Sequence, residues 1–237
     1  FSDIIPFEEK GELFQLRQQI VSRIHNGRIA LKHYWVLNNL NHIYPKAGVN
    51  LFDQEFGTLD SQIFSDGSSK SFQDSGFNNY LGFRLWDLYA GLEYKLKLGD
   101  LVIKPELNLH QYNWRVNQAG VEIKEEKKAV LLPALELKYE IGSSEHLNID
   151  YSLRSSFDDA STYANRLRLT NFNQLFKGNE NLQNELAHSF KLRYYQFNMY
   201  RGLFVNANFS YTRSLRSIKP VTQLQGIDQI INLIYSN

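Results

Sequence analysis

The chain has 237 residues, a net charge of +1 and no cysteine, which excludes a disulfide framework and a thiolate metal site. The balanced charge gives no reason to expect a nucleic-acid partner. No stretch approaches the roughly 18 apolar residues of a transmembrane helix. The first residues, from Phe1 to Pro6, resemble no signal peptide, so we expect the chain to be part of a longer mature protein.

Segments in which apolar and polar residues alternate recur along the chain, and each segment predicts a β-strand. We expect about nine strands, at 12–24, 28–40, 82–97, 101–114, 129–141, 146–157, 186–199, 203–216 and 228–236. In the clearest of them Leu135 and Leu137 alternate with Glu136 and Lys138. Long strands with one apolar and one ionic face suit a wall between lipid and water.

The connections between these segments fall into two classes. Tight turns that contain glycine are expected at His25-Asn26-Gly27, at 98–100, at 142–145 and at 200–202. Longer links are expected at 41–81, 115–128, 158–185 and 217–227, so that short and long connections alternate without exception. Outer-membrane barrels have short periplasmic turns and long external loops. The sequence therefore predicts an all-β, antiparallel, up-and-down transmembrane barrel in the bacterial outer membrane, incomplete in this chain.

The segment from Leu175 to Glu185 resembles a loop of TonB-dependent receptors of the Bacteroidetes type, which reads Gly-Asn-Pro-x-Leu-x-Pro-Glu before a long strand. The matching residues are Gly178, Asn179, Leu182 and Glu185, while Glu180 and Asn184 stand where the family usually has proline. We expect Gly178 and Asn179 to adopt left-handed backbone at a turn, and Leu182 to pack the loop onto the barrel rim.

The resemblance implies that residues 1–237 are part of one barrel domain of 22 strands, with the plug domain and the remaining strands outside this chain. It implies outer-membrane transport, in which the barrel wall belongs to a receptor that binds and imports a nutrient. The implied partners are outer-membrane lipid, the TonB complex acting through the plug, the nutrient ligand and a surface-exposed lipoprotein.

No residues predict catalysis, a cofactor or a metal site, so we do not expect an enzyme. Six histidines show no ligand spacing, and a single acidic pair, Asp158-Asp159, lacks the further oxygen ligands that Ca²⁺ requires. Glu136 and Glu140 are about 13 Å apart along a strand, too far for a glycosidase pair.

The aromatic residues allow two interpretations. Those near the long links could form a ligand entrance, and the candidates are Tyr80, Phe83, Trp86, Tyr112 and Trp114. Tyr112 and Trp114, with Tyr34 and Trp35, suit an interfacial girdle better.

Two other functions remain open at this stage: a TonB-independent porin or assembly barrel, and a soluble, secreted β-sandwich that binds carbohydrate. The architecture does not choose among glycans, siderophores, peptides and cobalamin as the ligand.

Overall fold

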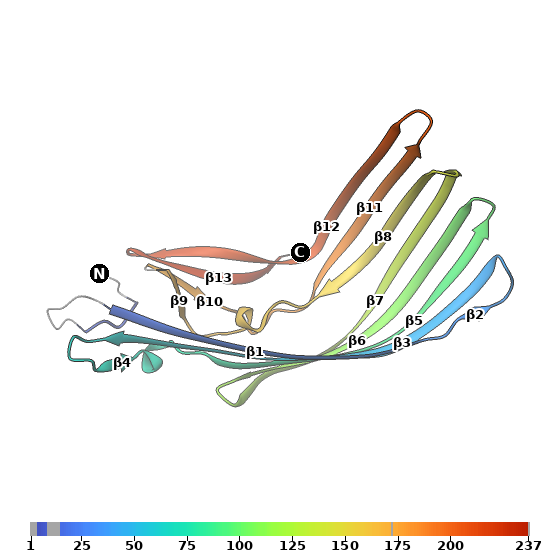
Figure 1. Ribbon diagram of the computed structural model, residues 1–237. Helices are drawn as coiled ribbons and strands as arrows, with labels where there is room; N and C mark the ends of the chain where they lie inside the picture. Colours follow the sequence, from blue (N-terminus) through green and yellow to red (C-terminus); the bar gives the residue numbers. More distant parts are fainter. Residues whose placement is uncertain (1–3, 9–14, 172, 237) are drawn as a thin grey trace.

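The computed structural model describes residues 4–8, 15–171 and 173–236, most of which lie in long strands (Figure 1). The strands are β1 (Gln15–Lys32), β2 (Trp35–Val36), β3 (Asn41–Ile63), β4 (Ser69–Ser71), β5 (Tyr80–Leu98), β6 (Leu101–Gln118), β7 (Val121–Gly142), β8 (Glu145–Ser156), β9 (Arg168–Asn171), β10 (Gln174–Lys177), β11 (Glu185–Asn198), β12 (Leu203–Gln225) and β13 (Asp228–Ser236). Two single-turn 3-10 helices are η1 (Gln73–Ser75) and η2 (Ala160–Thr162). Among the described residues, no helix is long and apolar enough to cross a membrane.

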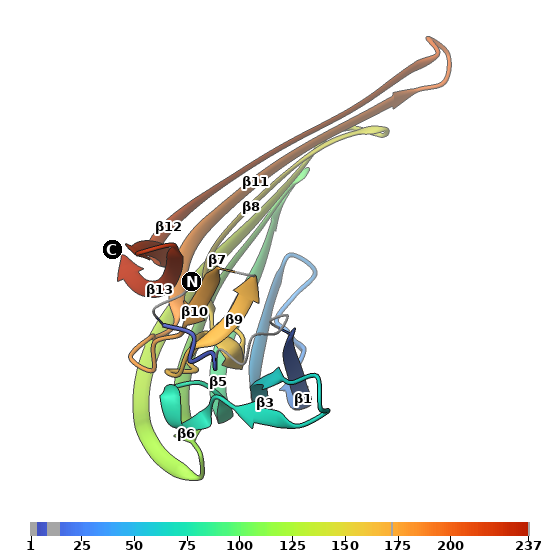
Figure 2. The same ribbon diagram turned by 90° about the vertical axis from the view of Figure 1, so that its left-hand side faces the viewer.

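The long strands form a curved antiparallel wall (Figures 1 and 2). Over the described residues the sheet follows the order β1-β3-β5-β6-β7-β8-β11-β12-β13-β10-β9, with β2 and β4 both paired to β3. At one end of the wall, here called the turn end, the strands are joined by 33–40, 99–100, 143–144 and 199–202. At the other, here called the outer end, the connections are 64–79, 119–120, 157–184 and 226–227. The predicted antiparallel, up-and-down barrel is confirmed, with short turns on the side that is periplasmic in such barrels.

The N-terminal part of the wall differs from the prediction. The expected tight turn at His25-Asn26-Gly27 is wrong, because β1 runs through it with Asn26 opposite Phe52 and Gly27 opposite Leu51. The predicted strand 28–40 is therefore the second half of β1 together with the turn that follows it. Most of the expected link 41–81 is the 23-residue strand β3. The predicted strand start at 12–14 lies outside the described residues.

Two of the four expected long links are also wrong. Strands β6 and β7 continue to a two-residue turn at Ala119-Gly120, where φ is 52° and 82°. Strands β12 and β13 likewise meet at 226–227, whereas 64–79 and 157–184 are long. The tight turns at 98–100, 142–145 and 200–202 are confirmed. Long and short connections thus do not alternate without exception, because strands extend into the positions expected for loops.

The convex face of the wall is apolar over a continuous band. On β7 this face carries alternate residues from Ala129 to Ile141, and Leu131 is 51% exposed on it. On β5 the same face carries Trp86, Leu88 and Leu92, each more than half exposed. Thirteen residues of β7 span about 40 Å, which a strand tilt of about 40° reduces to roughly 30 Å across the membrane. This height matches the hydrocarbon core of a bilayer, so the band is the lipid-facing surface.

The outer end has a second layer on the concave side of the wall. Beyond Arg216, β12 leaves β11 and pairs instead with β13, which pairs in parallel with β10 (Figures 1 and 2). A buried apolar cluster fills the space between the layers, and its members include Phe83, Trp114, Tyr163 and Leu182. The outer end therefore has a packed interior, which lies inside the curve of the wall.

Candidate functional site

The concave face of the wall is lined by ion pairs over the height of the lipid-facing band. On neighbouring strands Lys104 lies 3.3 Å from Glu136, and Lys138 lies 3.1 Å from the same carboxylate. Arg193 and Asp150 are 2.7 Å apart across β8 and β11. Lys46 pairs with Glu106, and Lys32 lies 2.8 Å from Glu93. The concave face is therefore hydrophilic opposite the apolar convex face, as in a barrel with a polar interior.

A groove of about 390 Å³ runs along this inner face. Its charged lining has four acidic and four basic residues, which are Glu93, Glu106, Glu136, Asp150, Lys104, Arg154, Lys191 and Arg193. The numbers are equal, so the groove has no net charge to attract ions of one sign. The groove is instead complementary to a polar surface that carries charges of both signs.

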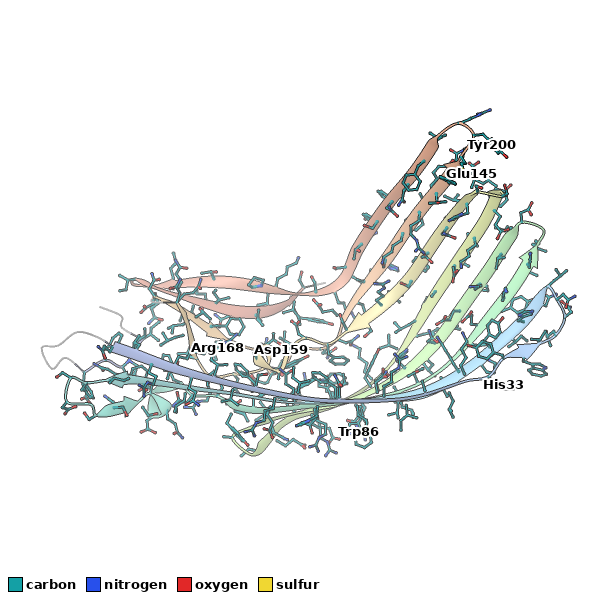
Figure 3. All side chains as sticks on the ribbon, in the orientation of Figure 1. His33, Trp86, Glu145, Asp159, Arg168 and Tyr200 are labelled. Carbon is teal, nitrogen blue, oxygen red and sulfur yellow. The ribbon has the colours of Figure 1, made fainter. Side chains whose placement is uncertain are left out.

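The five aromatic candidates do not lie together. Phe83 and Trp114 are completely buried on the concave side, and Tyr112 is 5% exposed there. Tyr80 and Trp86 lie on the convex side, 64% and 54% exposed, and Figure 3 shows Trp86 there, away from Asp159 and Arg168.

The girdle interpretation is wrong for two of its four members, Tyr112 and Trp114. Tyr112 and Trp114 face inward and are buried, so they do not meet the membrane interface. Tyr34 and Trp35 are exposed, but they lie next to the 33–40 connection, at the turn end rather than beside a long loop. Tyr139, which is 45% exposed on the convex face near the end of β7, does occupy an interfacial position.

Aromatic stacking and buried amide side chains, among them Gln54, hold the 157–184 loop inside the outer end. Tyr163 stacks on Phe83 with ring centroids 4.7 Å apart, and Phe157 meets Trp114 edge-on at 5.1 Å. The buried side chain of Gln54 accepts a hydrogen bond from the Ala160 N–H at 3.0 Å and donates one to Asp159 at 2.9 Å. No sequence signal indicated Gln54, because it falls in a segment expected to be a loop.

Charged groups of the loop lie in this partly buried space. Asp159 caps η2 by accepting from the Ser161 N–H at 2.8 Å. Burial alone would raise the pKa of Asp159, but the hydrogen bonds from Gln54 and Ser161 outweigh it and lower that pKa. Burial, reinforced by Glu185 and Asp159, raises the pKa of Asp158. Of the acidic pair, Asp159 therefore serves as the N-cap of η2.

Arg168 is a further charged group in this space. It lies between the rings of Phe56 and Phe176, at 5.3 and 4.5 Å from their centroids. Burial lowers the pKa of Arg168, and the carboxylates of Asp159 and Asp60 partly offset this decrease. Stacked on two rings, the guanidinium secures β9 against β3.

The four motif residues fix the end of the same loop. The Gly178 N–H donates to the Ala164 carbonyl, and the Asn179 N–H to the Thr162 carbonyl, both at 2.8 Å. Leu182 is fully buried, and Glu185 accepts from the Ile218 N–H at 2.8 Å. The expected left-handed backbone is wrong, since neither Gly178 nor Asn179 has a positive φ. Glycine is needed at 178 because a Cβ would lie 2.4 Å from the Thr162 carbonyl oxygen.

We expect Gly178→Ala to displace this loop from the outer end. The added methyl group would meet backbone atoms of Thr162 and Ala164, which cannot turn aside as a flexible side chain can. Overpacking of this kind costs about 1–3 kcal/mol. Limited proteolysis of the complete protein would show faster cleavage within 157–184. Gly67→Ala is unsuitable as a control because φ is 83° there. Gly82→Ala serves instead, because φ is in the ordinary range and the added Cβ would lie 3.9 Å from its nearest neighbour.

The histidines are dispersed along the described part of the chain. His110 lies 2.8 Å from Asp87, and His188 lies 2.9 Å from the Tyr151 hydroxyl. Within 4–8, 15–171 and 173–236, no three histidine or acidic side chains gather closely enough to hold a metal ion.

An antiparallel shell that is apolar outside and ionic inside defines the wall of an outer-membrane β-barrel. The chain belongs to the outer membrane protein β-barrel family, whose model matches residues 58–237. The protein is therefore located in the bacterial outer membrane, and the soluble β-sandwich alternative is wrong. No curated protein matches the chain.

Solved structures that are similar to this chain include the following two. The ferric citrate transporter FecA in its unliganded form has a TM-score of 0.49 and 12% identity, over 76% of this chain and 26% of that one. The siderophore receptor PirA from Pseudomonas aeruginosa has a TM-score of 0.35 and 10% identity, over 96% of this chain and 55% of that one. In both comparisons this chain spans less than two thirds of the other protein.

Proposed function

We propose that this chain is part of the barrel wall of a TonB-dependent receptor of the Bacteroidetes type, which binds a nutrient at its outer end and imports it. The supporting observation is that Phe157, Tyr163 and Leu182 of the 157–184 loop pack inside the outer end, in one apolar cluster with Phe83 and Trp114. An open porin needs a free aqueous path at this position. A receptor that retains its ligand until TonB acts needs a structured mouth.

The inner ion pairs fit the same proposal. A groove with equal numbers of acidic and basic groups suits contact with a folded plug domain, whose surface carries charges of both signs. The plug would be supplied by a part of the receptor outside residues 1–237, and TonB would act on it. A surface-exposed lipoprotein is proposed as a further partner at the outer end.

The edges of the wall support a larger barrel. Within the described residues, β1 pairs on one side only, and residues 203–216 of β12 pair only with β11. Each unpaired backbone group in lipid costs several kcal/mol. We therefore propose that further strands pair with both edges, toward a total of 22.

We also propose that the protein is not an enzyme and that its residues bind and guide the ligand unchanged. The ligand class is left to experiment. Uptake of labelled glycans, siderophores, peptides and cobalamin should be measured in cells that express the complete protein, with and without active TonB. We expect one class to accumulate, and its accumulation to require both the protein and TonB.

Conductance distinguishes the alternative of an open channel. The complete protein in a planar bilayer should give no steady open-channel current, because loop and plug fill the lumen. A stable conductance of porin size, or uptake that continues without TonB, would contradict the proposal.

A further inference from the structure

The convex face of the wall changes sharply from apolar to ionic toward the outer end. One register row crosses β1, β3, β5, β6 and β7, and its residues are His25, Asp53, Arg84, Arg115 and Glu125. At the next position on this face toward the turn end, β3 carries Leu51 and β5 carries Trp86. The row therefore marks the outer boundary of the lipid-facing band, where lipid headgroups lie.

Two adjoining hollows lie on this convex face just beyond the boundary, with volumes of about 470 and 230 Å³. Tyr80 and Glu55 line both of them. We use the name outer groove for the two hollows together. Its other polar lining residues are Gln19, Arg23, His25, Asp53, Thr58, Gln73, Asn78, Asn79, Arg84, Asn117 and Arg166. Such a lining offers amide, hydroxyl and charged groups around one exposed aromatic ring.

The floor of the outer groove is formed by residues without side chains. A Cβ on Gly57 would meet its nearest atom at 3.6 Å, and one on Gly82 at 3.9 Å. Neither glycine has a positive φ, so the backbone does not demand glycine there. Their absent side chains leave the ring of Tyr80 64% exposed beside the hollow. An exposed ring flanked by amides is suited to the apolar face and the hydroxyls of a sugar.

Arginines give the outer groove a place for phosphate. Arg84 lies 2.9 Å from Asp53, and Arg23 lies 3.5 Å from Glu55. All four side chains are more than 40% exposed, so these ion pairs contribute little and can rearrange. The planar guanidinium group binds phosphate through two parallel hydrogen bonds.

We propose that the outer groove binds the phosphorylated sugar part of a lipopolysaccharide molecule. Its position supports this occupant, because the groove is continuous with the lipid-facing band and faces away from the lumen. Lipopolysaccharide is the lipid whose phosphates and sugars lie at this level of the outer leaflet. Arginines, amides and an exposed tyrosine together match that headgroup, whereas a plain phospholipid headgroup offers no sugar to the tyrosine and amides.

The test measures binding of purified lipopolysaccharide to the complete protein after delipidation in detergent. The main variant is Arg23→Ser with Arg84→Ser, and Gly82→Phe fills the floor without removing charge. Arg201→Ser, in the exposed turn at 199–202, removes one charge at the opposite end as a control. We expect roughly tenfold weaker binding for the double variant and for Gly82→Phe, with Arg201→Ser unchanged.

Folding of each variant is checked by its resistance to unfolding in detergent before heating. Folded variants that bind lipopolysaccharide as tightly as the unaltered protein would overturn the proposal. Equal competition by phospholipid vesicles, or by a polysaccharide without phosphate, would also overturn it. We expect intact lipopolysaccharide to compete for binding, whereas phospholipid vesicles, polysaccharide without phosphate and dephosphorylated lipopolysaccharide should not compete.

Discussion

Ile149→Arg is expected to prevent assembly of the barrel in the outer membrane. Ile149 lies on the convex face of β8, opposite Leu137 on β7 and Leu192 on β11. An arginine on the lipid-facing surface near mid-bilayer costs about 2–4 kcal/mol. The measurement is the fraction of complete protein that reaches the outer membrane in a folded, heat-modifiable form.

Asn148→Arg is the matched control, because the adjacent residue points to the concave, polar face beside Lys138 and His146. The same side chain placed there remains in water and should leave assembly nearly unchanged. Equal loss from both substitutions would contradict the assignment of the two faces.

Phe83→Ala is expected to release the 157–184 loop from the outer end while the wall remains folded. Phe83 is fully buried, stacks on Tyr163 and lies 6.1 Å from Phe52 between ring centroids. Truncation of a buried phenylalanine costs about 3–5 kcal/mol, and the cavity would open under the loop. Trypsin should then cleave the complete protein at Arg166, Arg168 or Lys177, which lie within the loop.

Tyr80→Ala provides the comparison for that experiment. Tyr80 lies on the same strand as Phe83 but faces outward, so its removal should leave the tryptic pattern unchanged. A loop that remains equally resistant in Phe83→Ala would show that the aromatic cluster does not hold it.

Alternation predicted the strands well only where the wall has lipid on one side. Along β7 the residues from Ala129 to Ile141 alternate because one face meets hydrocarbon and the other meets water. From Lys128 to Lys124 both faces of β7 carry charged residues, and this part of the strand, which includes Glu125 and Glu126, has no alternation of apolar and polar residues. A pattern method interprets such a segment as a loop, although backbone pairing with β6 continues to Val121.

The error at Asn26-Gly27 has a related cause. These two residues together are a strong local signal for a hairpin. Pairing of β1 with residues 46–63 of β3 nevertheless forms one continuous ladder over 18 residues. A local turn would leave much of that ladder unpaired within the membrane, so tertiary pairing overrides the local preference.

Part of the candidate site could be predicted from the sequence. The inner charges of Glu136, Lys138 and Asp150 follow from the alternation and are found on the concave face. The split between Phe83 and Tyr80 could have been predicted from the strand period, because residues three apart face opposite sides. The contacts of Gln54 with Asp159 could not, since they join segments 105 residues apart.

Spin labels along β7 can show whether successive residues of this wall face lipid and lumen in alternation. The chain has no cysteine, so single cysteines at each position from Ala129 to Ile141 can carry a spin label in the complete protein, provided that no other cysteine is present. In a lipid bilayer, oxygen accessibility should peak at Leu131, Leu135 and Leu137, and accessibility to a water-soluble relaxation agent at Glu136 and Lys138. A uniform profile, or one with the two sets exchanged, would contradict the account.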